Sequence, residues 1–525
     1  MNMANIDRDS GLSAPSRETN YSEHEKLLNT TAAVQAQSVD NNTFPAVNPP
    51  PKTGHTRTGS VTTNVSGTLN QPLNIVVLGA SFAGLSIAHA FLDTTLAQLR
   101  TTSAAPNYRL ILISPSTHIY WNIGAPRALV ALGLIKQDDL FIPIEPGFQR
   151  HKGRPYTIIQ GRAITWDSNA RTVEVELLSS AAEKRYSQLS TTSSAQKRRS
   201  DNPLSPVSDA PRTQTVPYHA LIIATGSSAH SNLLSLHGPH TDTIAALTAI
   251  HSKLATAKSI VVCGGGTSGI ETAGQLATYL NYTRHWPVRR LIASPKKIIL
   301  LTGSDRCLPT FPLKQSKKAE RKLQSLGVDI RHNVRVTSAK EDFDLTGQVK
   351  VELDDDTTLI VDAYIPCTGV SPNAAFAPPA LRDEEGYVKT NAATCRVDEA
   401  GSRVYALGDV ASFSQNYTLD AYAAVPVVQA NLLNDLVAHE LRLASPYGGN
   451  QDAIDALKDE IYVRRDKDSQ LCPVTRFGGV GVLTGLALPS LMVHKMKGSD
   501  YRVRKAARVV VDGGNPYAKP FSKYE

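Results

Sequence analysis

The sequence predicts an α/β protein with two separate parallel-sheet domains. The prediction depends on two observations. The same unit, consisting of a strand, a glycine-rich turn, a helix and a second strand, occurs twice in the 525-residue chain. Each copy also opens with an apolar run of strand length. Two copies of this length are too few and too long for a solenoid repeat.

The two copies follow the same order of elements. The first has a strand at 73–78, a turn at 79–84, a helix from Leu85 and a strand at 108–113. The second has a strand at 259–263, a turn at 264–269, a helix from Ile270 to about Tyr279 and a strand at 297–301. A strand that leads through a tight turn into a helix and a second strand is typical of nucleotide-binding α/β domains.

Both turns carry the glycine pattern that binds the pyrophosphate of a dinucleotide. Glycine lets the backbone approach the phosphates, and the helix N-terminus offers free N–H groups and a partial positive charge. One such pattern is weak, but two in the same context favour two Rossmann-like domains. Ser81 replaces the middle glycine of the first turn and is small enough to allow the same approach. The predicted cofactor contacts are Gly79, Ser81, Phe82, Ala83 and Gly84 in the first turn, and Gly264, Gly266 and Gly269 in the second.

The residue at the end of the second strand of each copy is expected to contact the ribose of the bound dinucleotide. This residue is usually acidic. In the first copy no acid is present, and Ser114 is expected to make the contact. In the second copy Thr302 and Gly303 stand at this position, and Arg306 follows. Asp305 could swing inward and restore a preference for NADH. On balance we expect NADPH to be accepted at least as well as NADH, with Arg306 reading the 2′-phosphate.

Three further segments make the pattern specific. The strand 219–224 runs into Ala224-Thr225-Gly226, the strand 403–407 ends in Gly408-Asp409, and Cys367-Thr368-Gly369 follows a third apolar run. With the two glycine turns, they resemble the pyridine nucleotide–disulfide reductase superfamily over roughly residues 73–435. The resemblance implies an FAD domain split by an inserted NAD(P) domain, with Asp409 accepting a hydrogen bond from the flavin ribityl chain. It also implies a helix from about Ala424, with Pro426 near its first turn, pointing at the flavin. The residues implied are Thr225, Gly226, Gly369, Gly408, Asp409 and Val428 for cofactor binding, and Gln429 for catalysis.

Within that superfamily, the sequence resembles the group without a redox-active cysteine pair. No cysteine precedes Cys263, and the monooxygenase linker motif is absent. The segments 266–274, 121–129 and 478–481 resemble apoptosis-inducing-factor-like proteins, ferroptosis suppressor protein and type II NADH dehydrogenases. The resemblance implies a role for Glu271 at the nicotinamide–flavin junction, with simple stabilisation of the helix start as the alternative. Arg127 is expected near the flavin or its pyrophosphate, unless it merely caps a helix.

These observations predict the following domains: a disordered tail at 1–72, an FAD domain at 73–255 and 361–435 with a flexible insertion at 179–214, an NAD(P) domain at 256–360, and a small C-terminal domain at 436–525. The tail is rich in Ser, Thr, Asn and Pro and has few large apolar residues, so it cannot bury enough surface to offset its ordering entropy.

Composition restricts compartment and partners. Five widely spaced cysteines without a C-x-x-C pair indicate a reducing compartment and no disulfide framework. No secretory signal is evident. We therefore expect a cytoplasmic or mitochondrion-associated protein that is not secreted. The net charge of +8 is more typical of a general solvated surface than of specific nucleic-acid recognition. The histidines form no metal-binding array, so no metal is predicted.

Residues 477–508 combine a glycine-broken apolar stretch with a basic cluster. The apolar part is too short and too interrupted for a transmembrane helix. A peripheral membrane contact remains open, against packing as a small domain on the FAD domain. The predicted activity is hydride transfer from NAD(P)H to FAD, with electrons passing to a quinone or other small acceptor. The alternatives are a biosynthetic flavoenzyme acting on a secondary metabolite and a death effector that binds DNA non-specifically.

Overall fold

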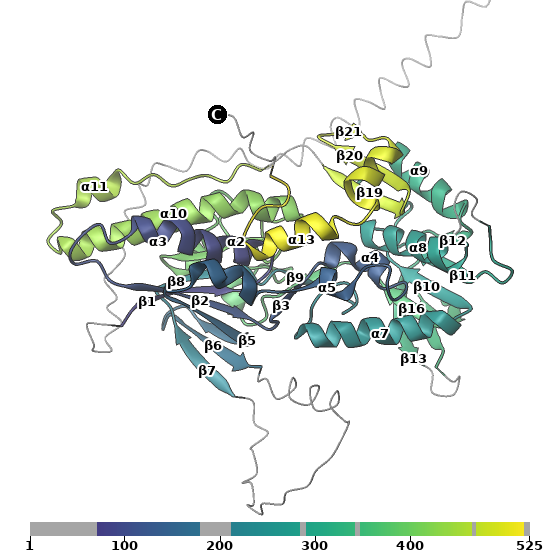
Figure 1. Cartoon of the computed structure of the whole chain (residues 1–525), viewed down its shortest axis with the longest axis horizontal. Coiled ribbons are helices and arrows are strands. Elements are labelled where there is room, and N and C mark those ends of the chain that lie inside the picture. The colour runs from purple at the N-terminus through teal and green to yellow at the C-terminus, as the bar shows by residue number, and fades with distance from the viewer. Residues whose placement is uncertain (1–70, 179–211, 284–289, 342–346, 465–468, 519–525) are drawn as a thin grey trace, which may run out of the picture. The chain divides into compact units, whose positions relative to one another are not determined.

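The computed structural model describes residues 71–178, 212–283, 290–341, 347–464 and 469–518 (Figure 1). Nearly all of the predicted disordered tail, and residues 179–211 of the predicted insertion, lie outside the described residues. The described chain contains two main sheets, one for each glycine-rich unit. The fold class predicted from the sequence is confirmed.

The first main sheet has seven strands in the order β18-β8-β1-β2-β5-β6-β7. Pairing is parallel from β18 to β5, and β5, β6 and β7 are antiparallel. The side chains of β1 from Ile75 to Leu78 are buried on both faces, as expected for a central parallel strand. The strands are β1 (Leu73–Leu78), β2 (Tyr108–Ser114), β5 (Tyr156–Asp167), β6 (Thr172–Leu177), β7 (Thr213–Pro217), β8 (Ala220–Ile223) and β18 (Val404–Ala406).

The second main sheet has four parallel strands in the order β12-β11-β10-β16. Its strands are β10 (Ser259–Cys263), β11 (Lys297–Leu301), β12 (Val328–Arg331) and β16 (Ala363–Pro366). An antiparallel sheet of β13 (Val336–Glu341), β14 (Val349–Leu353) and β15 (Thr358–Val361) follows β12 in the chain. Because β16 pairs with β10, the second sheet extends beyond residue 360, where the sequence analysis placed the boundary. Only afterwards does the chain return to the first sheet through β18.

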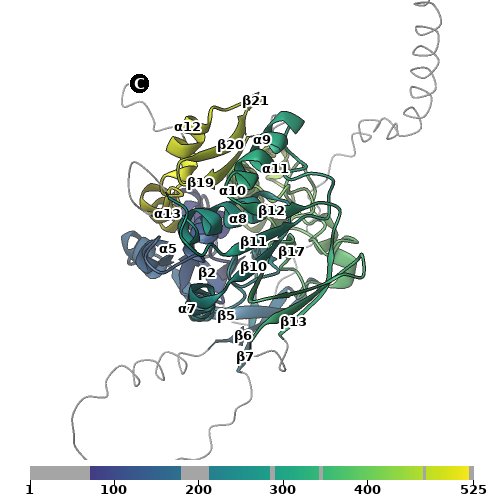
Figure 2. The ribbon, with the colours of Figure 1, turned by 90° about the vertical axis from the view of Figure 1, so that its right-hand side faces the viewer.

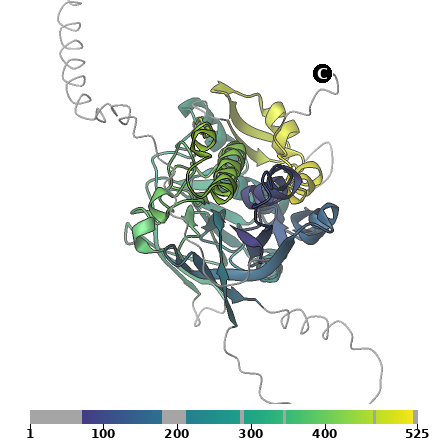
Figure 3. The same cartoon turned by 90° about the vertical axis from the view of Figure 1, so that its left-hand side faces the viewer.

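Helices α2 (Phe82–Ala90) and α10 (Thr418–Ala444) pack against each other beside the first sheet (Figures 1 and 3). Helix α10 begins at Thr418, so the expectation of a start near Ala424 was wrong. Pro426 lies inside the helix, and its side chain is exposed. The exposed position lets the ring sit on the solvent side, where a missing backbone hydrogen bond is least costly.

The remaining elements frame the second sheet and connect the two halves. Helices α7 (His240–Thr256), α8 (Thr267–Leu280) and α9 (Leu313–Gln324) belong to the second half. The short elements are β3 (His118–Tyr120), α4 (Ala125–Ala128), α5 (Gln137–Leu140), β4 (Phe141–Pro143), β9 (Ser227–Ala229) and β17 (Val370–Pro372). Strands β9 and β17 pair antiparallel where the chain passes between the halves.

The C-terminal region contacts both halves (Figure 2). Its elements are α11 (Gln451–Asp455), β19 (Gln470–Thr475), β20 (Gly478–Leu483), β21 (Leu486–Ala487), α12 (Ser490–Val493) and α13 (Val503–Val511). Strand β19 packs on α8 so closely that a Cβ at Gly274 would lie 1.9 Å from the carbonyl oxygen of Val474. Helix α13 packs on α2. None of the described helices is both long and apolar enough to cross a membrane.

Candidate dinucleotide site

One cavity of about 1010 Å³ is lined by both glycine-rich turns. This volume is at the upper end of the range for small-molecule sites. The carboxyl ends of β1 and β10 both lead into its wall, as expected for ligand sites on open parallel sheets. The predicted residues that line the cavity are Gly79, Ser81, Phe82, Ala83, Ser114, Thr225, Gly226, Gly264, Gly266, Glu271, Gly369, Gly408 and Asp409.

The two glycine turns use the same geometry. Gly79 and Gly264 have φ angles of +98° and +126°, which favour glycine. One turn into each helix, a Cβ at Gly84 would lie 1.9 Å from the carbonyl oxygen of Gly79, and a Cβ at Gly269 would lie 1.9 Å from that of Gly264. Gly84 and Gly269 are not in the cavity wall. They allow each helix to pack on its own turn, which places the helix N-terminus at the cavity.

Both helix N-termini suit a bound anion. Ser81 and Gly266 are the N-cap residues of α2 and α8, and neither makes a side-chain capping bond. The first turns contain no acidic residue. The free N–H groups and the positive end of each helix dipole therefore face the cavity, with no carboxylate in the first helical turn to compete.

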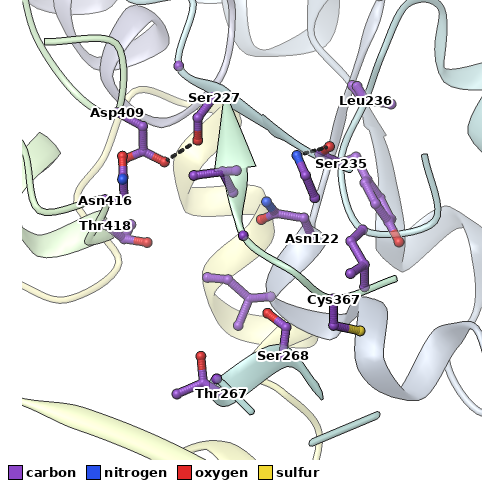
Figure 4. Close-up of a pocket in the computed structure, with 18 of the residues that line it drawn as sticks. Asn122, Ser227, Ser235, Leu236, Thr267, Ser268, Cys367, Asp409, Asn416 and Thr418 are labelled. Atoms are coloured by element: carbon purple, nitrogen blue, oxygen red, sulfur yellow. Dashed lines mark hydrogen bonds between the residues drawn. The ribbon is translucent and has the colours of Figure 1, made fainter. Parts of the chain in front are cut away.

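The rest of the wall has room and polar groups for two dinucleotides. A Cβ at Gly226, Gly266 or Gly369 would meet no atom within 4 Å, so the backbone at these three lining positions is open to a ligand. Burial raises the pKa of the Asp409 carboxyl, and a hydrogen bond of 3.1 Å from the Ser227 hydroxyl opposes that rise. Figure 4 shows this pair on the opposite side of the view from Thr267 and Ser268. The residues present therefore fit two bound dinucleotides.

A buried ion pair lies at the cavity wall on the side of the second turn. The Lys497 ammonium donates a hydrogen bond of 2.7 Å to Oε1 of Glu271, and both residues line the cavity. Burial raises the pKa of Glu271, while Lys497 opposes the rise. The Tyr501 ring lies 5.6 Å from the Lys497 nitrogen. Lys497 comes from the segment after α12, so the C-terminal region completes this part of the site.

Arg127, Val428 and Gln429, like Gly84 and Gly269, are predicted site residues that do not line the cavity. Arg127 is buried, with its guanidinium 3.0 Å from Oε1 of Gln275, 2.9 Å from the Ser499 carbonyl oxygen and stacked over the Tyr501 ring at 4.6 Å. Gln429 donates its hydrogen bond to the Thr94 hydroxyl at 2.6 Å, and Val428 is buried in the core of the first half. Helix α10 starts earlier than expected, which moves both residues about three turns from its N-terminus. Neither residue lines the cavity, and their contacts with the cofactor stay predictions.

The arginine that lines the cavity is Arg335, and not Arg306, which the sequence predicted to contact the 2′-phosphate. Arg306 donates a hydrogen bond of 2.7 Å to the carbonyl oxygen of Pro309 and does not line the cavity. Arg335 does line the cavity, just before β13. A Cβ at Gly303 would lie 3.0 Å from Cγ of Arg335, so this side chain crosses the end of β11. Among the described residues, no carboxylate forms an ion pair with Arg335.

All five cysteines are buried and unpaired. Cys263 and Cys367 line the cavity. Burial raises the pKa of both thiols, to about 12 for Cys367. Because the thiolate is the reactive form, these side chains are inert thiols at neutral pH.

Sequence comparison identifies the family. The model of the pyridine nucleotide-disulphide oxidoreductase family matches residues 73–427. The chain belongs to this family. As a pyridine nucleotide-disulphide oxidoreductase family member it uses FAD and NAD(P)H, and it is a flavin-dependent oxidoreductase.

Two fungal relatives of this family member cover much of its length. Oxidoreductase phnG of Penicillium herquei is 31% identical over 433 residues, which are 82% of this chain and 93% of the relative. Oxidoreductase ptaL of Pestalotiopsis fici is 31% identical over 344 residues, which are 64% and 76% of the two chains. The crystal structure of a covalent putidaredoxin reductase–putidaredoxin complex has the same fold, with a TM-score of 0.50, 16% identity and coverage of 78% of this chain and 81% of that chain.

More distant relatives belong to two of the groups that the sequence resembles. Ferroptosis suppressor protein 1 of Taeniopygia guttata is 22% identical over 84% of this chain and 97% of its own. The type II NADH:quinone oxidoreductase NdhA of Mycobacterium tuberculosis is 24% identical over 50% of each chain. The family predicted from the sequence is confirmed, and the specific likeness to apoptosis-inducing factor stays a prediction.

Sequence reasoning missed the residues that no local pattern marks. Lys497 is 226 positions from Glu271 in the chain, and its neighbours suggested a surface cluster instead. Arg335 could have been found, because it follows the third parallel strand of the second half and such strand ends meet at one edge of a sheet. Asn122, Ser235, Asn416 and Thr418 also line the cavity (Figure 4) and carry no sequence signal.

Proposed function

We propose that this oxidoreductase accepts NADPH at least as well as NADH and reduces a quinone-like small molecule. Bound FAD would accept a hydride from the nicotinamide and supply electrons to the acceptor. The observation that carries the proposal is the Glu271–Lys497 ion pair in the wall of the cavity that both glycine turns line. In this proposal the pair supplies a fixed positive charge and a buried carboxylate at the junction of the two bound dinucleotides.

A small acceptor is supported by the state of the cysteines. The described structure offers no reactive thiol at the cavity, because burial keeps Cys263 and Cys367 protonated. This favours an acceptor molecule that enters the cavity itself. The distant relative named as an NADH:quinone oxidoreductase makes a quinone the first class to test.

Lys497 is proposed to hold the charge of Glu271 and to stabilise negative charge that develops beside it. A fixed ammonium in a water-poor site needs no reorganisation when charge appears. The C-terminal segment that carries Lys497 is held by Arg127, whose guanidinium binds the Ser499 carbonyl oxygen. In this proposal Arg127 is a positioning residue that acts through Lys497 and does not contact the cofactor.

The test is steady-state oxidation of NADPH and NADH by the flavin-loaded protein against a panel of quinones and oxygen. We expect Lys497→Met to lower kcat for quinone reduction at least tenfold and to shift the acidic limb of its pH profile upward, because the Glu271 carboxyl loses its cation. Lys497→Arg should restore most of the activity. Lys495→Met is the matched control, since Lys495 is exposed two residues away, and it should match the native enzyme.

The proposal fails if no quinone is reduced faster than oxygen by the flavin-loaded protein. The role of the ion pair fails separately if Lys497→Met and Lys495→Met give the same kcat and pH profile. Flavin absorbance and the thermal midpoint of each variant show whether the site has remained folded.

A further inference from the structure

Three side chains with metal-binding atoms meet in the second half of the molecule, outside the dinucleotide cavity. They are Cys307 in the loop after β11, Glu320 on α9 and His332 one residue after β12. One ligand atom from each lies within 4.8 Å of the others. The residues are 12 or 13 positions apart in the sequence, so no short spacing motif connects them and the sequence analysis did not predict a metal site.

We propose that Cys307, Glu320 and His332 bind a zinc ion, with water in the fourth position. A thiolate, a carboxylate and an imidazole form a donor set that zinc accepts, and three protein ligands with one open position are a known zinc arrangement. Zinc would neutralise the two negative ligands, the Cys307 thiolate and the Glu320 carboxylate.

The geometry needs only a small contraction to hold the ion. Zinc–ligand distances of about 2.0–2.3 Å place tetrahedral ligand atoms about 3.3–3.8 Å apart. Nε2 of His332 is already 3.8 Å from Oε1 of Glu320. The Glu320 and His332 side chains are 18% and 30% exposed, so an ion can enter from solvent, while Cys307 is fully buried behind them.

The site is partly organised without the ion. The backbone N–H of Cys307 donates a hydrogen bond of 2.8 Å to Oε1 of Glu320, which holds the carboxylate beside the cysteine. The Ser316 hydroxyl, from the same helix as Glu320, donates to the carbonyl oxygen of Leu308 at 3.0 Å. Burial and the Glu320 carboxylate raise the pKa of the Cys307 thiol to about 12. The free site is therefore a protonated thiol, and zinc binding releases that proton to solvent.

The ion would brace one wall of the dinucleotide cavity. The backbone N–H of Leu308, next to Cys307, donates to the carbonyl oxygen of Gly265 in the second glycine turn at 2.7 Å. Thr302, Gly303, Ser304 and Pro309, which flank Cys307 in the chain, line the cavity. Zinc at Cys307 thus ties the loop after β11 to α9 and β12, and this loop borders the site of the nicotinamide dinucleotide.

The experiment is zinc binding to the flavin-loaded, metal-free protein, measured by equilibrium dialysis and by zinc-edge X-ray absorption. We expect one equivalent per chain, with one sulfur ligand at about 2.3 Å and the others nitrogen or oxygen. His332→Gln should weaken binding at least tenfold, since the loss of even an outer-shell partner of a metal ligand costs about ten- to hundredfold. His494→Gln is the control, because His494 is a partly exposed histidine on a different element.

Cys307→Ser should remove the sulfur ligand from the absorption spectrum. If that variant does not fold, His332→Gln, whose side chain is partly exposed, still decides the question. The proposal is overturned if the native protein shows no sulfur ligand, or if His332→Gln binds zinc as tightly as His494→Gln does. Zinc should also raise the thermal midpoint of the native protein and leave that of His332→Gln unchanged.

Discussion

At the scale of single residues, we expect the choice between NADPH and NADH to depend on which arginine lies near the ribose. Arg335 crosses the end of β11 and lines the cavity, whereas Arg306 is bonded to Pro309 outside the wall. The backbone N–H of Arg335 donates to Oδ1 of Asp354 at 2.9 Å, which fixes the position of its backbone. An exposed guanidinium held at this point suits the 2′-phosphate of NADPH.

We therefore expect Arg335→Ala to raise the KM for NADPH about ten- to hundredfold, because a charge-assisted hydrogen bond contributes about 1.5–3 kcal/mol. The KM for NADH should change little, since NADH has no 2′-phosphate. Arg306→Ala is the matched control and should leave both constants near native values. If Arg306→Ala raises the KM for NADPH more than Arg335→Ala does, Arg306 contacts the phosphate, as the sequence predicted.

At the scale of elements, the buried His89 of α2 contacts helix α13 through one ring nitrogen and His151 through the other. Nε2 of His89 lies 2.9 Å from the Val511 carbonyl oxygen, and Nδ1 lies 2.8 Å from Nε2 of His151. The bond to the carbonyl requires a proton on Nε2 of His89, so its Nδ1 accepts from His151. A second proton on His89 would require His151 to move its own proton from Nε2 to Nδ1, which lies 3.5 Å from Oδ1 of Asp93. Burial, followed by Arg150, lowers the pKa of His89 from 6.5 to about 4.

This arrangement predicts a loss of stability in acid. The folded chain binds the His89 proton more weakly than the unfolded chain, so the contribution is present above about pH 6.5 and disappears as the pH falls towards 4. The full difference is about 3 kcal/mol. His89→Gln should lower the slope of unfolding free energy against pH by up to one proton in this window, measured by urea titration. Burial also lowers the pKa values of His240 and His439, so a residual slope should remain. Equal slopes in the variant and the native protein would contradict the prediction.

The C-terminal elements also carry the side chains on which the proposed peripheral membrane contact rests. The tip of β20 and β21 exposes Leu483 and Leu486, and α12 exposes Leu491 and Met492. Lys495, Arg504, Lys505 and Arg508 are exposed nearby in the chain. Lys497 lies in the same segment, but it is paired with Glu271 and is not counted among the exposed charges.

We expect the native protein to sediment with anionic liposomes, with weaker binding at high salt because exposed charges are screened. The double variant Leu486→Ser, Leu491→Ser should reduce sedimentation, since apolar burial in the interface is lost. Replacing Lys495, Arg504 and Lys505 by Gln should remove most of the salt dependence. If the protein does not sediment with these vesicles at any salt concentration, the membrane contact is wrong.

At the scale of the whole molecule, the sequence predicted the parts that local patterns determine. Strand β1, the turn to Gly84 and helix α2 are all encoded within 18 residues, 73–90, so their period and turn chemistry were sufficient. The start of α10 was placed too late because Pro426 resembled a first-turn proline, whereas tertiary packing lets the helix continue through it. The Glu271–Lys497 pair and the Cys307, Glu320, His332 cluster depend on how distant segments pack, which periodicity cannot show.

The route by which electrons leave the protein also depends on how distant segments pack. Cys263 ends β10, and Cys367 directly follows the neighbouring parallel strand β16. Both residues line the same cavity, as a dithiol centre would require. Their raised pKa values argue that they only fill space. The double variant Cys263→Ala, Cys367→Ala should keep quinone turnover within about an order of magnitude of the native value. Flavin content and the KM for NADPH, measured on the same preparation, show whether the wall has kept its shape. Normal flavin content with turnover abolished would mean that electrons pass from the flavin to the acceptor through these thiols, and the assignment to the group without a redox-active cysteine pair would be wrong.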